Sequence, residues 1–233
     1  EVRRAEDGIR SWAAEGGEYY ASFTGELGGM WRRMGRAPQS VAGTAVMMLL
    51  FGLAACGATL LQEKEDGTLL RLLACPTPPS AILYGKFLYA FVVGCLQLFV
   101  MFAFGRVVYG LPVEKHLFGT AAFIAATAAA ATGFGVLLAV VGRSRKQIEG
   151  LSTLIILVMS AIGGSWFPQL IMPEWMQRVA GFTLTGWSMK GFQGLYYFGK
   201  STAELWPQLA LLFGLAAALL ALSTTLFRRR FAA

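Results

Sequence analysis

One segment near the C-terminus has the spacing of a phosphate-binding loop. Residues 194–201, GLYYFGKS, satisfy the pattern G-x-x-x-x-G-K-[ST], in which backbone amides and a lysine surround a phosphate group. The four variable positions are bulky, and no strand is predicted to lead into the loop, as the motif requires. We therefore interpret the match as a coincidence of spacing and predict no nucleotide site here.

Other residues with catalytic or metal-binding potential are few and scattered. His116 is the only histidine, and Cys56, Cys75 and Cys95 have no metal-ligand spacing. No carboxylate falls in the middle of a long apolar segment, where proton relays or metal chemistry would need one. The sequence argues against an intramembrane enzyme, gives little support to a proton-coupled carrier, and predicts no catalytic, cofactor or metal site in this chain.

The elements that position these residues are apolar segments typical of transmembrane helices. Hydrophobic residues make up 56% of the 233 residues, more than the core of a soluble domain needs. A bilayer core about 30 Å thick requires roughly 20 apolar residues in a helix. We expect such helices over residues 41–61, 87–109, 118–141, 149–170 and 205–227. The expected fold class is an all-α, polytopic helical membrane protein with five visible transmembrane helices.

The third of these segments is rich in small residues. Alanine dominates residues 121–131, and Gly133 and Gly135 follow. Small residues let neighbouring backbones approach closely in membranes, so we predict tight helix packing here and no chemistry.

The basic residues predict which helix ends face the cytoplasm. Outside residues 1–40, nine Lys and Arg residues lie in 64–86, 143–146 and 228–230, and five lie at the opposite helix ends. The positive-inside rule assigns the richer set, and with it the C-terminus, to the cytoplasm. Because these charges sit at helix ends near membrane lipid, and not in a stripe, the sequence also argues against nucleic-acid binding.

Residues 1–40 differ from the rest of the chain. They hold six basic and six acidic residues and no signal-peptide pattern, and the sequence begins at Glu1 without a methionine. Five helices with a cytoplasmic C-terminus place this segment on the outer side of the membrane. We expect residues 1–40 to be the tail of an extracytoplasmic segment, with a sixth transmembrane helix upstream.

The predicted cytoplasmic loop after the first helix contains a second motif. Residues 63–79 read EKEDGTLLRLLACPTPP. Acidic residues favour a helix start, Gly67 permits a bend, and Pro76 ends the helix, so we expect a short helix outside the bilayer. One face of this helix would carry Leu69, Leu72 and Leu73. A helix lying on the lipid surface is the alternative interpretation.

The run from Glu63 to Lys86 closely resembles the motif of ABC type-2 transporter permeases. In that family, acidic-x-acidic-x-Gly-Thr-Leu-x-Arg-Leu-Leu and a proline precede a Gly-Lys pair that opens the next helix. Leu70 departs from the pattern, since a polar residue is frequent there. Most of the chain fits the family, so residues 41–233 are expected to form an ABC type-2 permease transmembrane domain.

The resemblance implies a transport role and two kinds of protein partner. It implies a permease subunit of an ABC exporter in a prokaryotic cytoplasmic (inner) membrane, paired with a second, identical or different, permease subunit. An ATP-binding cassette subunit would bind ATP and Mg²⁺ and would dock on the short helix, which acts as a coupling helix in the family. The residues given this coupling role are Glu63, Glu65, Gly67, Thr68, Leu69, Arg71 and Leu72.

A second matching region covers residues 163–187, where the family also shows a Gly-Gly break, two prolines and a tryptophan. Such breaks are tolerated where protein or water covers the freed backbone groups, so we expect an outer re-entrant or interfacial hairpin. Its aromatic residues also suit a membrane-interface belt. The family has an outer gate here, and the matching residues are Gly163, Gly164, Phe167, Pro168 and Pro173.

Two other functions stay open at this point. A membrane anchor or assembly subunit would scaffold partners without moving a substrate. An ion-coupled secondary carrier would depend on an ion gradient and would need buried ionisable residues. Nucleotide-dependent transport distinguishes the exporter from both.

Overall fold

The computed structural model describes residues 36–74, 79–142, 144–167, 169 and 172–231. The chain divides between residues 36 and 37, and the fold below is that of the unit Ala37–Ala233. Most of the expected extracytoplasmic tail lies outside the described residues, as do Pro76, Arg143 and Pro168.

The described chain is built from helices. They are α2 (Arg36–Glu65), α3 (Thr68–Leu73), α4 (Pro79–Tyr109), the 3₁₀ helix η1 (Val113–His116), α5 (Leu117–Val141), α6 (Arg145–Ile162), α7 (Glu174–Ala180), α8 (Leu184–Tyr196) and α9 (Trp206–Phe231). The described residues contain no strand. This confirms the expected all-α fold class.

Four helices are long and apolar enough to cross a membrane. Their spans are Gln39–Glu63, Ala81–Tyr109, Val113–Val141 and Trp206–Arg229. They correspond to four of the five expected transmembrane segments. The fifth, expected over 149–170, is shorter and more polar: α6 has 18 residues, three of them charged (Arg145, Lys146 and Glu149), and it ends at Ile162. Apolar residues continue beyond Gly163, but the helix does not.

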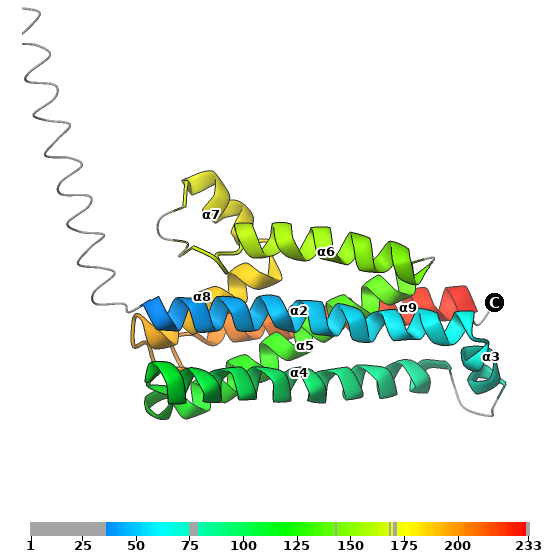
Figure 1. The fold of residues 1–233 in the computed structure, drawn as a ribbon, viewed down its shortest axis with the longest axis horizontal. Helices are drawn as coiled ribbons and strands as arrows, with labels where there is room; N and C mark the ends of the chain where they lie inside the picture. The colour runs from blue at the N-terminus through cyan, green and yellow to red at the C-terminus, as the bar shows by residue number, and fades with distance from the viewer. Residues whose placement is uncertain (1–35, 75–78, 143, 168, 170–171, 232–233) are drawn as a thin grey trace, which may run out of the picture. The chain divides into compact units, whose positions relative to one another are not determined.

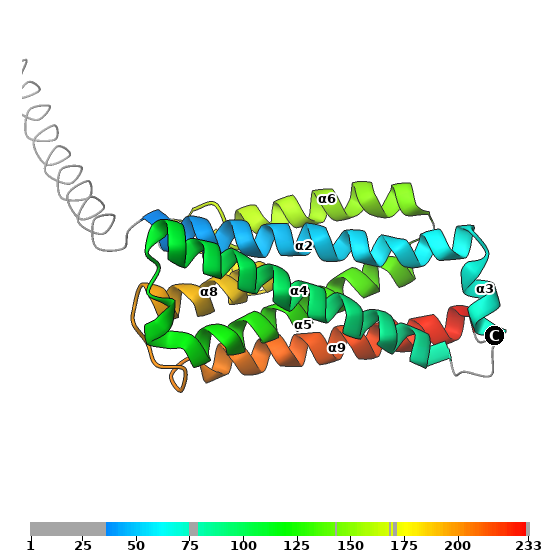
Figure 2. The ribbon, with the colours of Figure 1, turned by 60° about the horizontal axis from the view of Figure 1, so that its bottom comes forward.

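The helices pass repeatedly between two ends of the unit (Figures 1 and 2). One end carries α3, the connection from α5 to α6, and the last turns of α9; we call it the α3 end. The opposite end carries η1 and the loops around α7 and α8, and we call it the α8 end. Because α6 returns the chain to the α8 end, the three segments predicted to be cytoplasmic lie together at the α3 end.

The centre of the bundle is α5. In the span Val113–Val141, 72% of the apolar window is buried, against 22% in Ala81–Tyr109 and 17% in Trp206–Arg229. A Cβ atom added to Gly135 would lie 2.5 Å from the Leu53 carbonyl oxygen of α2, and one at Gly133 would lie 3.0 Å from Leu219 Cβ of α9. The prediction of tight packing by small residues is therefore confirmed.

Candidate functional site

The predicted short helix is present, and a glycine turn connects it to α2. α2 ends at Glu65, and α3 begins at Thr68. Gly67 between them has a φ of +72°, in the left-handed region that glycine adopts readily. The preceding Asp66 N–H donates to the Gln62 carbonyl over 2.8 Å. This turn takes the chain out of the long helix and sets α3 at the end of the bundle (Figure 2).

The two described leucines of the predicted face are in different environments. Leu69 is 1% exposed, whereas Leu72 is 40% exposed. Leu69 belongs to an apolar cluster drawn from four other helices: Leu60, Leu83, Val136, Ala139, Val140 and Phe227. Leu69 therefore anchors α3 to the bundle, and of the two only Leu72 offers an apolar surface to a partner.

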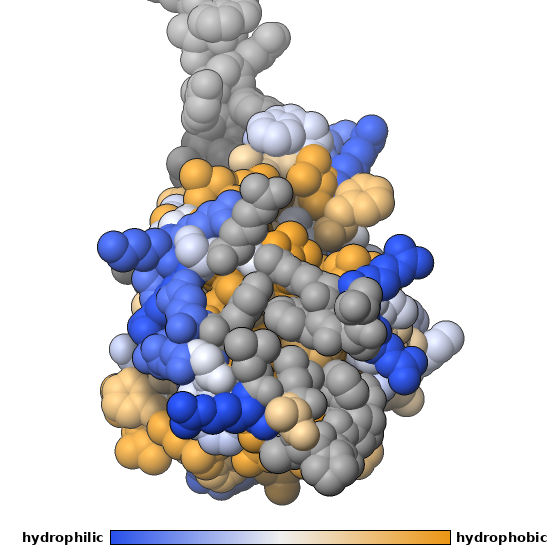
Figure 3. All heavy atoms as spheres, turned by 90° about the vertical axis from the view of Figure 1, so that its right-hand side faces the viewer, coloured by the Kyte–Doolittle hydropathy of each residue, from blue (hydrophilic) through white to orange (hydrophobic). Residues whose placement is uncertain are grey.

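Polar side chains surround Leu72 at this end. Glu65, Asp66, Thr68 and Arg71 are all exposed. Figure 3 looks onto this end of the molecule and shows hydrophilic side chains gathered on both sides of the face. The arrangement gives the α3 end a mixed polar and apolar surface, which suits a water-facing protein partner better than lipid.

Polar contacts also tie the ends of α2, α4 and α6 together. Lys86 Nζ donates to Glu63 Oε1 over 2.6 Å. The Arg145 guanidinium donates to Gln62 Oε1 over 2.7 Å, and the Arg145 backbone N–H donates to Glu65 Oε1 over 3.4 Å. Two of the predicted coupling residues, Glu63 and Glu65, therefore hold neighbouring helix ends in place. Sequence reasoning missed Gln62 and treated Arg145 as an orientation signal only.

At the α8 end, the Gly163-Gly164 break lies in a network of glutamine side chains. Gln39 Nε2 donates to the Gly164 carbonyl over 2.5 Å, and Gln169 Nε2 donates to the Gly163 carbonyl over 2.7 Å. Gln193 Nε2 donates to Gln39 Oε1 over 2.8 Å. All three glutamines are buried. Of the two possible covers named above, protein or water, protein side chains supply donors to the carbonyls of both glycines.

The glutamine network was not predicted. The available signal was three glutamines in or beside apolar segments, where an uncharged polar side chain needs hydrogen-bond partners. α2 also approaches the break closely, because a Cβ atom added to Gly43 would lie 1.9 Å from the Ser165 carbonyl oxygen.

The four described residues nominated for an outer gate differ in exposure. Gly163 and Gly164 are buried, whereas Phe167 is 58% exposed and Pro173 lies exposed at the start of α7. Pro168 lies outside the described residues. The expected hairpin consists of α7 and α8, and α8 packs into the bundle through Met189, Phe192 and Leu195, which are at most 1% exposed.

We expect Gln39→Leu to lower the stability of the bundle. The substitution leaves the Gly164 carbonyl and Gln193 Nε2 buried without their partner, which costs about 2 kcal/mol. Thermal unfolding in detergent measures the effect. Thr153→Val removes an exposed side-chain hydrogen bond of α6 and is the control. Equal midpoints for the two variants would show that the network does not contribute to stability.

The local structure around the phosphate-loop match agrees with its rejection. Residues 184–196 form a helix, α8, where the motif needs a strand. Gly194 lies inside this helix, with a Cβ position 2.7 Å from Leu205 Cδ2, so its backbone faces protein. Among the residues that the structure describes, no three His, Cys, Asp or Glu side chains are placed to hold a metal ion.

Long apolar helices pack around α5, with the short helix α3 at one end and the hairpin of α7 and the buried α8 at the other. This arrangement defines a polytopic helical membrane domain. Residues 32–225 match the family described as ABC-2 family transporter protein. The chain belongs to this family, as the motif at residues 63–86 predicts.

Three curated relatives are similar to this chain. The inner membrane transport permease YhhJ of Escherichia coli (strain K12) is 27% identical over 177 residues, covering 74% of this chain and 46% of that protein. Linearmycin resistance permease protein LnrN of Bacillus subtilis (strain 168) is 22% identical, covering 70% and 42%. Putative transport permease YvfS of the same organism is 23% identical, covering 71% and 61%. The chain thus spans about half the length of the curated relatives it matches.

Proposed function

We propose that this chain is part of the transmembrane permease subunit of an ABC exporter, driven by ATP hydrolysis in a separate nucleotide-binding subunit. The observation that carries the proposal is the placement of α3. Its exposed side offers Leu72 among polar residues, while Leu69 is buried in an apolar cluster with residues of α2, α4, α5 and α9. A partner that moves α3 would therefore move the transmembrane helices with it.

The assembly would contain two permease subunits and two ATP-binding subunits in a prokaryotic cytoplasmic membrane. ATP and Mg²⁺ would bind to the ATP-binding subunits. A row of exposed apolar residues along α6, consisting of Leu151, Leu154, Leu157 and Val158, supports a contact with lipid or a second permease subunit. The names of the relatives, all permeases, support the transport role.

The test is recovery of the ATP-binding subunit with the full-length protein after co-expression. We expect Leu72→Glu to reduce this recovery at least tenfold, equivalent to about 1.4 kcal/mol of binding. Leu117→Glu, which changes an exposed leucine at the α8 end, should leave recovery unchanged. Equal recovery with both variants would remove α3 as the docking element. Transport that follows an ion gradient and not ATP would favour a secondary carrier.

We also expect the α3 end to face the cytoplasm. A cysteine replacing the exposed Lys146 should react poorly with a membrane-impermeant reagent in intact cells. A cysteine replacing the exposed Lys115, in η1 at the other end, should react strongly and is the matched control. The reverse labelling pattern would show that the orientation is inverted.

A further inference from the structure

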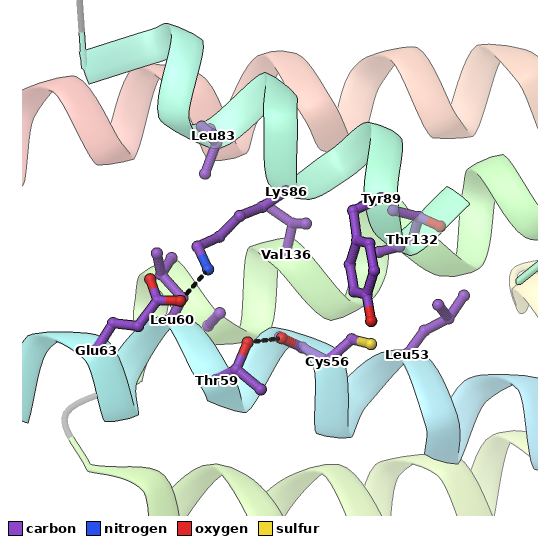
Figure 4. A pocket seen from close by; sticks show the side chains of 13 residues that line it. Leu53, Cys56, Thr59, Leu60, Glu63, Leu83, Lys86, Tyr89, Thr132 and Val136 are labelled. Carbon is purple, nitrogen blue, oxygen red and sulfur yellow. Dashed lines mark hydrogen bonds and ion pairs between the residues drawn. The ribbon is translucent and has the colours of Figure 1, made fainter. Parts of the chain in front are cut away.

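A cavity of about 290 Å³ lies between α2, α4 and α5 near the α3 end (Figure 4). Most of its wall is apolar and includes Leu53, Leu60, Leu83, Ala90, Val136 and Ala139. Its polar side is formed by Glu63 of α2 and Lys86 of α4, which point toward each other across the gap between the two helices. Thr132 of α5 lines the cavity as well.

Two polar atoms of this cavity lack a hydrogen-bond partner among the described residues. Glu63 Oε1 accepts from Lys86 Nζ over 2.6 Å, but Glu63 Oε2 is buried and unpaired. Thr132 is 1% exposed, and its hydroxyl is also unpaired. Buried polar atoms in native proteins are nearly always paired with protein, water or a ligand, so both atoms mark places where a polar group can bind. Glu63 Oε2 in particular calls for an N–H or O–H donor.

The ion pair restricts the charge of that ligand. Glu63 and Lys86 have side chains that are 31% and 26% exposed, and together they are neutral, so a ligand without net charge keeps the charges at this side of the cavity balanced. A zwitterion meets both needs, because its ammonium group donates to Glu63 Oε2 and its anionic oxygen accepts from Lys86. The lysine ammonium has three donors and can serve the carboxylate and an anion at once.

The size and surroundings of the cavity indicate the rest of the ligand. At about 30 Å³ for one water molecule, the cavity holds of the order of ten water-sized groups, which is enough for a lipid headgroup but not for acyl chains. Tyr89 lines the cavity and is 66% exposed, and Leu88 and Val92 beside it on α4 are 61% and 56% exposed. Of these three residues only Tyr89 lines the cavity; Leu88 and Val92 belong to the exposed apolar surface of α4, which suits contact with lipid chains.

We propose that this cavity binds a phosphoethanolamine group, with its primary ammonium on Glu63 and its phosphate on Lys86. The source is either a membrane phospholipid or a soluble phosphoethanolamine compound. In this assignment the ammonium group must carry N–H, and the trimethylammonium group of phosphatidylcholine has none to donate to Glu63 Oε2. Discrimination between these two headgroups is therefore the distinguishing property of the site.

The experiment uses the full-length protein reconstituted in vesicles of phosphatidylcholine alone or of equal parts phosphatidylcholine and phosphatidylethanolamine. No nucleotide is added, so the result does not depend on the proposed exporter activity. Cys56 lines the cavity, and its alkylation rate reports occupancy once every other cysteine of the full-length protein, including Cys75 and Cys95, is replaced by alanine. We expect phosphatidylethanolamine to slow alkylation about tenfold. Mass spectrometry of retained lipid gives an independent measure.

Two variants and one control test the assignment. Glu63→Gln removes the anionic acceptor, and Ala90→Leu fills the cavity while leaving the ion pair intact; both should abolish the preference for phosphatidylethanolamine. Glu114→Gln removes the carboxylate paired with Arg106 at the opposite end of α4 and should keep it.

Equal retention and equal protection by the two lipids would overturn the proposal, as would an unchanged preference in both Glu63→Gln and Ala90→Leu. Protection by soluble phosphoethanolamine in pure phosphatidylcholine vesicles, as strong as that by the lipid, would support the site with a soluble source. Protection by the lipid alone would support a membrane source.

Discussion

Among the substitutions that replace a glycine of α5 with alanine, Gly135→Ala should destabilise the protein most. The new Cβ atom would lie 2.5 Å from the Leu53 carbonyl oxygen and 3.0 Å from its carbon, both backbone atoms of α2. A backbone atom cannot rotate away as a side chain can, so α2 and α5 must separate. We expect a loss of about 3 kcal/mol, the upper part of the range for overpacking. Thermal unfolding in detergent should show a midpoint lowered by about 6–12 °C.

Gly214→Ala is the matched control for this substitution. Gly214 also lies inside a long helix, α9, but a Cβ atom there would meet nothing within 4 Å. Alanine is the better helix former, so this variant should be neutral or stabilised by up to about 1 kcal/mol. If Gly135→Ala unfolds at the same temperature as Gly214→Ala, the close crossing of α2 and α5 is not a determinant of stability.

Gly67→Pro should uncouple transport from ATP hydrolysis in the assembled transporter. Gly67 has a φ of +72°, and proline is fixed near −65°, so the turn between α2 and α3 must rearrange. Because a Cβ atom at Gly67 would meet nothing within 4 Å, the substitution acts through backbone conformation and not through a clash. We expect transport and its stimulation of ATP hydrolysis to fall about tenfold, equivalent to about 1.4 kcal/mol of coupling.

Gly67→Asn separates the conformation of the turn from the identity of the residue. Asparagine tolerates the left-handed region better than other side chains, so this variant should keep transport within about twofold of the parent. Membrane insertion should be normal for both variants and can be checked by the amount of protein in isolated membranes. Parental transport by Gly67→Pro would mean that the position of α3 does not carry the signal.

The sequence was a good guide to what depends on local composition. Runs of apolar residues predicted the long helices, since a helix in lipid needs little beyond length and hydrophobicity. The short helix after Gly67 followed from a glycine, flanking acids and a leucine run. The end of α6 did not follow from hydrophobicity, which predicted a span over 149–170; the Gly163-Gly164 pair was the signal that predicted a break there. Neither signal showed that Gln39, far away in the chain, and Gln169 satisfy the carbonyls at this break.

The different environments of Leu69 and Leu72 in α3 could not be predicted, because the burial of Leu69 depends on distant residues. Leu69 and Leu72 are three residues apart, so helix periodicity put them together on one surface. Leu69 instead belongs to an apolar cluster that includes Phe227 of α9, a residue more than 150 positions later in the chain. The unpaired Glu63 Oε2 and the cavity beside it also depend on the packing of three helices. Such contacts need the assembled bundle and cannot be read from spacing.

The burial of Leu69 has a mechanical consequence for α3. A loop connected to the bundle only at its two ends would change shape when a partner pushed on it, and the transmembrane helices would not move. Under the proposed coupling role, a force applied at Leu72 would reach the apolar cluster that Leu69 shares with residues of four long helices. A displacement of α3 by a partner would then tilt these helices together.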